Sequence, residues 1–340
     1  GGRAKSVECK GLACNQQTPT KNAVLDNGQH ILIGAYRSCI GLMQSLGLTI
    51  DQLFYRQTLA MNYPNGNGIR FPNLNSPWNA LFGILTAKGW SFKDKLSLLW
   101  VTSRWQISNF KCAPNSSVKD LCKGTTAKVL NELLEPICIS ALNISASQAD
   151  GQLFLNVIKD TLFAGLGASD FLIPYGDLSD TFAKPAEHWL TQHNCEVLTH
   201  QRIIHLEAQS HLGQLHWKLH FANTLEATDL LPLQSEIYDH VVLACNAPNA
   251  AQVIEKSYLD YQAQAKTEVS DVLAWPQHTQ QWLSTTRALE FNSITTVYLA
   301  YKGKGLSQAM LALNSSQTEP AQFVFDKAYL KGPKGVLAFV

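Results

Sequence analysis

The stretch that decides the fold lies near the start of the chain and reads Val24-Leu25-Asp26-Asn27-Gly28-Gln29-His30-Ile31-Leu32-Ile33-Gly34. It places a polar turn between two short apolar runs, which predicts strand segments joined by a loop that comes close to another group. Gly28 permits this approach because it has no Cβ atom. Residues 36–46 follow with apolar side chains at helical spacing and stop at Gly47, which predicts a helix with a C-terminal glycine.

Helical periodicity dominates residues 76–163. Ser91 and Asp94 form a capping box ahead of a tryptophan-rich helix, and a second helix is expected over residues 125–134, where it meets Pro136. A third helix is expected over residues 153–162.

Three of the eight tryptophans lie close together within this helical block, at Trp90, Trp100 and Trp105. They fit the hydrophobic core of the block, and they also fit one wall of a site for a long apolar ligand. Their spacing does not separate these two interpretations.

The pattern changes to α/β after Pro185. Residues 238–245 form a buried-type strand followed by a turn and a helix, which indicates a parallel, doubly wound sheet. A helix is expected over residues 186–193, two short strands over residues 196–198 and 203–206, and a half-exposed strand over residues 215–221. Residues 294–301, 322–325 and 336–340 predict an antiparallel sheet. Residues 62–77 and 258–278 are expected to be linkers.

Composition excludes several classes of protein. The 27 Lys and Arg residues nearly balance the 26 Asp and Glu residues, so the totals show no electrostatic footprint for nucleic acid. Charged residues are only 16% and hydrophobic residues 46%, which fits an apolar ligand and excludes general disorder. The eight cysteines lack the spacing of a zinc site or a redox dithiol, and no metal is expected.

Both ends of the sequence are expected to continue in a longer protein. The chain begins with Gly1 inside a Gly-Gly-Arg motif, and its last apolar run, residues 335–340, stops without a turn or a polar tail.

The order of these motifs resembles the FAD-dependent amine oxidase and carotenoid desaturase superfamily, and within it the squalene-associated FAD-dependent desaturases, also called hydroxysqualene dehydroxylases. The resemblance covers most of the chain. The residues that carry it are Gly1 to Ala4, Leu25 to Arg37, Leu134 to Asn143, Ala168 to Pro174 and Ile294 to Leu299.

The resemblance implies an α/β fold of the FAD-linked oxidoreductase type. Its cofactor domain, with an incomplete parallel sheet, would comprise residues 1–50 and 175–278, and a substrate domain of helices and an antiparallel sheet would comprise residues 51–174 and 279–340. The family's N-terminal G-x-G-x-x-G turn and C-terminal flavin-contacting helix are absent from this sequence, so the chain as given is not expected to hold FAD tightly or to be active by itself.

The cofactor contacts implied by the resemblance are Gly1, Gly2, Arg3, Gly28, Gln29, His30, Ile203, Ala244 and Asn246. Arg3 offers planar donors to a phosphate, and the segment around His30 would pass beside the flavin ring. A structural, hydrogen-bonded His30 and a core position for Ile203 fit the sequence equally well. Asp26 is expected to fix the turn.

The reaction implied is the reductive removal of hydroxide from hydroxysqualene to give squalene, in squalene and hopanoid synthesis, with NADPH as a possible electron donor. Hydroxide is a poor leaving group, so an acid is needed, and Asp170 and then His30 are the catalytic candidates. Asp170 also fits a helix or turn cap after Ser169. A desaturase acting on a carotenoid precursor such as phytoene, or a truncated binding protein without catalysis, remain alternatives.

The partner implied is a long-chain C30 isoprenoid. Such a substrate is stored in membranes, so the expectation is a cytoplasmic protein that contacts the inner face of the cytoplasmic membrane peripherally. No spanning helix is expected, because no run of 18 uncharged apolar residues occurs.

Overall fold

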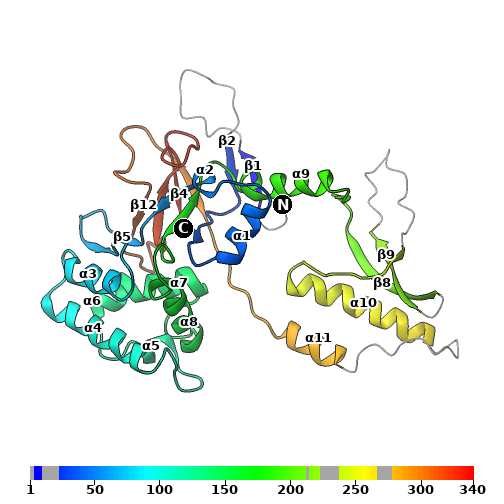
Figure 1. Cartoon of the computed structure of the whole chain (residues 1–340), viewed down its shortest axis with the longest axis horizontal. Coiled ribbons are helices and arrows are strands. Elements are labelled where there is room, and N and C mark those ends of the chain that lie inside the picture. Colours follow the sequence, from blue (N-terminus) through cyan, green and yellow to red (C-terminus); the bar gives the residue numbers. More distant parts are fainter. Residues whose placement is uncertain (1–3, 10–22, 212–213, 223–236, 266–277) are drawn as a thin grey trace. The chain divides into compact units, whose positions relative to one another are not determined.

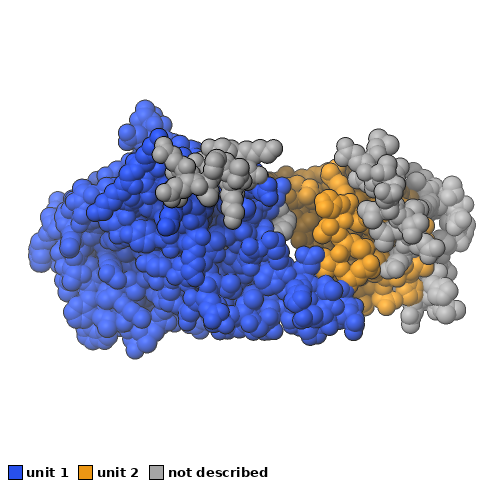
Figure 2. Space-filling model, turned by 90° about the horizontal axis from the view of Figure 1, so that it is seen from above, with its two compact units in different colours: residues 1–195, 292–340 blue, residues 196–291 orange. Residues whose placement is uncertain are grey.

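The computed structural model describes residues 4–9, 23–211, 214–222, 237–265 and 278–340. The chain divides into two compact units, residues 1–195 with 292–340 and residues 196–291, coloured blue and orange in Figure 2. These units reflect contacts within the chain and do not test the functional domains predicted above, which stay a prediction.

Unit 1 begins with a two-stranded hairpin of β1 (Ser6–Cys9) and β2 (Ala23–Asp26), which leads directly into the polar turn at Asn27–His30. The chain then forms β3 (Leu32–Ile33) and α1 (Arg37–Ser45), as the periodicity predicts. After α2 (Ile50–Leu53), β4 (Phe54–Gln57) and the distant β7 (Phe171–Pro174) complete a sheet of order β3-β7-β4. This sheet fixes the end of the polar turn against the middle of the chain.

The helical block between β6 and β7 follows the sequence prediction closely. It contains α3 (Trp78–Thr86), α4 (Phe92–Ile107), α5 (Val118–Leu121), α6 (Ala127–Val129), the π-helical turn η1 (Leu130–Leu134), α7 (Glu135–Leu142) and α8 (Gly151–Leu162). The Ser91–Asp94 capping box is confirmed. The expected end at Pro136 is wrong: Pro136 lies in the first turn of α7, a place where a helix tolerates the missing N–H.

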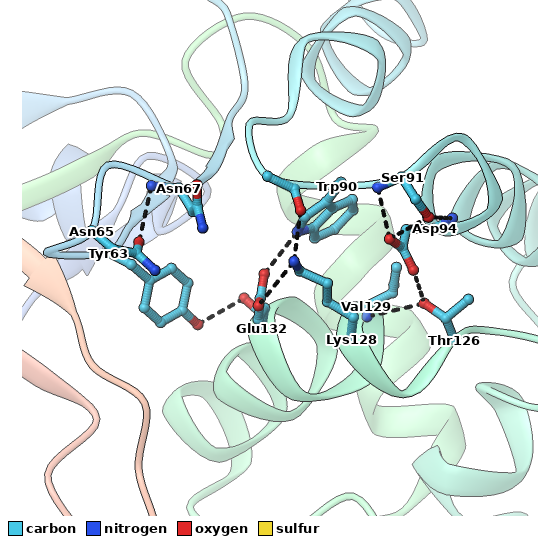
Figure 3. Close-up of polar contacts among 11 residues, drawn as sticks. Tyr63, Asn65, Asn67, Trp90, Ser91, Asp94, Thr126, Lys128, Val129 and Glu132 are labelled. Atoms are coloured by element: carbon cyan, nitrogen blue, oxygen red, sulfur yellow. Dashed lines mark hydrogen bonds and ion pairs between the residues drawn. The ribbon is translucent and has the colours of Figure 1, made fainter.

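Two of the three clustered tryptophans belong to the core. The indole N–H of Trp90 donates to the Glu132 carboxylate at 2.9 Å, and the Lys128 ammonium lies 3.8 Å from the same carboxylate (Figure 3). Trp105 is buried and packs edge to face with the fully buried Phe154. Trp100 is instead exposed. The core interpretation therefore holds for Trp90 and Trp105 only.

The C-terminal part of unit 1 is the antiparallel sheet that the sequence predicts. It has the order β11-β14-β13-β12, from β11 (Val297–Ala300), β12 (Met310–Ala312), β13 (Phe323–Asp326) and β14 (Val336–Phe339). Strand β12 was not predicted. The expected linker over residues 62–77 is wrong at its start, because β5 (Ala60–Asn62) and β6 (Gly68–Arg70) form a hairpin there. The intervening turn needs Gly66 and Gly68 at positive φ.

After β7, the π-helical turn η2 (Ser179–Ala183) and α9 (Lys184–Gln192) end the first part of unit 1. Unit 2 consists of an antiparallel sheet, β10 (Ile237–Tyr238), β9 (Gln214–Phe221) and β8 (Ile203–His211), together with α10 (Ala247–Ala265) and α11 (Thr279–Arg287). Figure 1 shows α10 beside β8.

Three predictions for unit 2 need correction. Residues 196–198 form no strand, and the linker expected over residues 258–278 begins later because α10 continues to Ala265; residues 266–277 lie outside the described residues. Residues 241–244 are not in a strand, and Val242 is 87% exposed. A continuous apolar run is buried in a sheet only when strands flank it. The strand pairs among the described residues are all antiparallel, and none of them includes residues 241–244. This run is therefore left without a partner.

Candidate functional site

The polar turn at Asn27–His30 is held from one side by the C-terminal sheet. The Tyr298 hydroxyl donates to the carbonyl oxygen of Asp26 at 2.9 Å, and the backbone N–H of Gln29 donates to the Thr296 hydroxyl at 3.3 Å. Both partners come from β11 or the residue before it. The turn therefore rests on a strand that lies about 270 residues further along the chain.

The other side of the turn is accessible. His30 is exposed, and Gly28 and Gln29 are partly exposed. A Cβ atom added at Gly28 would meet the His30 ring at 3.4 Å and the Thr296 hydroxyl at 3.9 Å, and no backbone atom within 4 Å. A turn that is fixed from behind, small at Gly28 and open in front fits the edge of a flat ring such as a flavin.

Asp26 fixes the turn rather than facing solvent. Its buried carboxylate accepts from the backbone N–H of Leu178 at 2.8 Å, and the Ser6 hydroxyl lies 3.1 Å from it. The same hydroxyl is 2.7 Å from the carboxylate of Asp177. Two acidic side chains therefore lie next to each other behind the turn.

Lys327 is the buried cation of this region, and the sequence analysis did not identify it. It follows β13, is only 3% exposed, and its ammonium donates to the Gln29 side-chain oxygen at 3.3 Å. Burial lowers the pKa of Lys327 below its ordinary value of 10.5, and the charges of Asp26 and Asp177 act in the opposite direction. In the sequence, Lys327 is marked only by its place directly after the β-forming run Phe323–Asp326.

The lowered pKa of Lys327 predicts a pH dependence. Between the folded-state pKa and 10.5 the unfolded chain binds more protons than the folded one. The contribution of Lys327 to the unfolding free energy therefore rises as pH increases toward 10.5 and falls as pH decreases to the folded-state pKa. We expect the unfolding free energy of the wild type to rise relative to Lys327→Met between neutral pH and 10.5, as measured by urea unfolding. A Lys334→Met control, at an exposed lysine, should follow the wild type. Parallel curves for wild type and Lys327→Met would contradict the effect.

Asp170 lies in a separate corner of the same unit. It is 5% exposed, and its carboxylate accepts from the Arg56 guanidinium at 3.1 Å, across the β4–β7 pair. It precedes a strand, so the helix cap weighed above is not formed. Gly34 donates to the Asp170 carbonyl at 2.9 Å, and His30 is four residues before Gly34, a length of extended chain of about 13 Å. Asp170 and His30 are therefore connected through the paired strands β3 and β7, and their side chains make no direct contact.

The remaining predicted cofactor residues are distributed over the chain. Gly1, Gly2 and Arg3 lie outside the described residues. Ile203, Ala244 and Asn246 lie in unit 2, whose placement relative to the turn is not described. Ile203 begins β8 and is partly buried, and Asn246 accepts from the N–H of Asn249 at the start of α10. Their cofactor contacts stay predictions.

An apolar cavity of about 580 Å³ opens on the opposite face of the C-terminal sheet. Val297 and Phe339, which are paired across β11 and β14, line it together with Leu313 and Pro320. Because side chains alternate along a strand, Val297 points away from the face on which Thr296 and Tyr298 hold the turn. This cavity is therefore separated from His30 by the sheet itself.

No group of three His, Cys, Asp or Glu side chains in the described part of the chain is arranged to hold a metal ion.

Comparison with known proteins decides the family. The sequence pattern of the flavin-containing amine oxidoreductases matches residues 1–339. The chain belongs to this family. Membership supports a flavin cofactor and an oxidoreductase activity.

Individual relatives are more distant. The chain is 27% identical over 216 residues to a hydroxysqualene dehydroxylase of Zymomonas mobilis, a match that covers 62% of this chain and 48% of that protein, so the chain spans about half the length of this relative. A reduced UDP-galactopyranose mutase aligns with a TM-score of 0.54, 11% identity and coverage of 99% of this chain and 63% of the other. A putrescine oxidase variant aligns with a TM-score of 0.56, 12% identity and coverage of 100% and 67%. These structures support the predicted α/β fold class. The parallel sheet expected for the cofactor domain is not formed by the described residues, whose strand pairs are all antiparallel.

Proposed function

We propose that the chain is part of a flavin-dependent enzyme that removes the hydroxyl group of hydroxysqualene reductively and releases squalene. The dehydroxylase of Zymomonas mobilis supports this substrate class. The observation that carries the proposal is the turn at Asn27–His30, which is held from behind by Thr296, Tyr298 and Lys327 and open in front.

At the substrate, the proposed reaction breaks one bond and forms two. The substrate C–O bond breaks, a hydride adds to the same carbon, and a proton joins the departing hydroxide to form water. A bound flavin supplies the hydride, and NADPH is a candidate source of its electrons. The protein has to hold the substrate carbon near the ring edge, exclude water and deliver one proton to the leaving oxygen.

Residues of this chain would divide these tasks. Gly28 allows the close approach of the ring, and Lys327 positions the turn through Gln29 without touching the substrate. His30 is exposed beside Gly28 and is a candidate to donate the proton. Asp170 stays a second candidate, but its carboxylate is already bound by Arg56, so it would have to break an ion pair to act.

If His30 donates the proton, His30→Gln should lower the rate of squalene formation by about 10²- to 10⁴-fold. The melting temperature should not change, because His30 is exposed. His188→Gln, at an exposed histidine of α9, is the matched control and should leave both quantities unchanged. A His30→Gln enzyme with the wild-type rate and pH profile would remove His30 from the mechanism.

The proposed function is tested with the full-length protein that contains this chain. It is loaded with flavin and incubated without oxygen with hydroxysqualene and a chemical reductant, and the products are identified by mass spectrometry. Squalene that forms only with reduced flavin supports the proposal. A more unsaturated product from a carotenoid precursor with oxidised flavin would favour a desaturase, and a flavin-free, inert protein would favour a binding protein.

A further inference from the structure

Helix α4 of unit 1 carries apolar side chains on two opposite faces. Leu98, Val101 and Trp105 are buried in the core of the helical block. On the other side, Phe92, Leu96 and Trp100 follow one another at four-residue spacing, and Phe92 is 75% exposed. A surface helix normally presents polar residues there.

The neighbouring helix α3 repeats the pattern. Its buried face contains Ala80 and Ile84, while Trp78, Phe82 and Leu85 form an exposed stripe at spacings of four and three residues. Figure 1 shows the two helices side by side, in cyan, within the helical block. The exposed stripes of α3 and α4 together are called the α3–α4 surface below. Its residues are Trp78, Phe82, Leu85, Phe92, Leu96 and Trp100.

Specific contacts hold this surface in place. The Lys95 ammonium of α4 donates to the Leu85 carbonyl at the end of α3 at 2.7 Å, which ties the two stripes together. The Trp100 ring lies against Gly124, where an added Cβ atom would be 2.4 Å from the ring, and the Arg104 guanidinium lies 4.9 Å from the ring centre. Trp100 therefore contacts the protein on one side although it is 56% exposed.

Within the segment that forms this surface the exposed charges have one sign. Residues 74–111 contain five basic side chains, Lys88, Lys93, Lys95, Arg104 and Lys111, and a single acid, Asp94. Asp94 is buried in the capping box, where Ser91 and Thr126 bind its carboxylate. The whole chain has a net charge of only +1, so this local excess of positive charge is a property of the region.

We propose that the α3–α4 surface docks on an anionic lipid membrane. Exposed Trp, Phe and Leu side chains beside Lys and Arg are the composition of a segment that lies in a membrane interface. The apolar stripes would enter the boundary of the acyl chains, and the lysines would meet anionic head groups. No helix in the described residues is long and apolar enough to cross a bilayer.

Charge complementarity is what favours lipid over another occupant. A protein partner would need an acidic apolar face to match the α3–α4 surface, and a second copy of the chain would bring the same lysines together with unfavourable like charges. The inference does not depend on the proposed reaction, because neither flavin nor substrate takes part in docking.

The test is flotation of the protein with vesicles of phosphatidylcholine alone or of phosphatidylcholine and phosphatidylglycerol in equal amounts. We expect flotation with the anionic vesicles. The double variant Phe82→Ser, Phe92→Ser should lower partitioning by about tenfold or more, because two large apolar side chains no longer insert. Phe291→Ser, at an exposed phenylalanine outside this surface, should float like the wild type.

A second pair of variants tests the charges. Lys88→Gln with Lys93→Gln should lower partitioning onto the anionic vesicles by about tenfold and have little effect on pure phosphatidylcholine. Lys119→Gln, at an exposed lysine of α5, is the matched control. Since the changed side chains are exposed, unchanged melting temperatures should show that the fold is intact.

Two outcomes would overturn the proposal. One is a wild-type protein that does not float with anionic vesicles, or variants that float as well as the wild type. The other is concentration-dependent self-association without vesicles that the Phe82→Ser, Phe92→Ser variant loses, which would make the α3–α4 surface an interface between copies of the chain.

Discussion

Gly34→Ala is expected to destabilise unit 1 by about 3 kcal/mol or more, because the corner that follows the polar turn has no room for a methyl group. A Cβ atom at Gly34 would lie 1.9 Å from the carbonyl oxygen of Gly167 and 2.9 Å from its carbonyl carbon. Both are backbone atoms, so no side-chain rotation relieves the overlap. The Gly34 N–H also donates to the Asp170 carbonyl, and this hydrogen bond would be strained by any shift.

A matched glycine substitution is available seven residues later. Gly41 lies on the exposed side of α1, and an added Cβ atom there meets nothing within 4 Å. Gly41→Ala should therefore stabilise the protein by about 0.5–1 kcal/mol through the higher helix propensity of alanine. Urea unfolding of the two variants gives shifts of opposite sign. A Gly34→Ala protein as stable as the wild type would show that the strand β3 and the Gly167 turn are further apart than described.

Breaking the Arg56–Asp170 pair is the second large effect. Arg56→Met leaves the buried Asp170 carboxylate without its cation, and we expect a loss of about 2–4 kcal/mol, less than for a fully buried pair because the Arg56 side chain is 43% exposed. Asp170→Asn keeps an oxygen that can accept from the guanidinium and should cost about 1 kcal/mol.

The same variants decide what Asp170 does. If Asp170 positions the β4–β7 corner, Arg56→Met and Asp170→Asn should lower the rate of squalene formation only as far as they unfold the protein, and the double variant Arg56→Met, Asp170→Leu should recover part of the stability. If Asp170 is the acid, Asp170→Asn should lower the rate about 10²- to 10⁴-fold in a folded enzyme. We expect the first result.

Local patterns explain which parts of the fold could be predicted. Helices α1 and α8 and strand β9 follow from the spacing of apolar residues, and the start of α4 follows from a Ser and an Asp three residues apart. These signals are contained within about a dozen residues. The three longer strands of the C-terminal sheet were recognised for the same reason.

The elements that the sequence did not reveal are short or depend on distant partners. Strands β5, β6 and β12 have three residues each, too few for an alternating pattern, and β5 and β6 border a turn rich in Asn and Gly. Residues 241–244 have the composition of a buried strand but no described strand beside them. Whether such a run is paired is decided outside the run itself.

The candidate site likewise contains some residues that local sequence patterns locate and others that they do not. The turn at Asn27–His30 could be located by its Gly and its polar residues, and the role of Asp26 as a structural residue follows from its place in a turn. Lys327 and Arg56 could not be found, because a single basic residue has no periodicity. Their importance arises only when Asp26, Asp177 and Asp170 are brought to them from elsewhere in the chain.

The most direct test of the account is a single-turnover measurement. The full-length protein that contains this chain, loaded with flavin, reduced once and freed of excess reductant under anaerobic conditions, is mixed with hydroxysqualene while flavin absorbance is followed. The account predicts that the flavin is reoxidised and that one squalene forms for each flavin reoxidised. Reduced flavin that persists in the presence of hydroxysqualene, in a protein that holds its flavin, would contradict the proposed reaction.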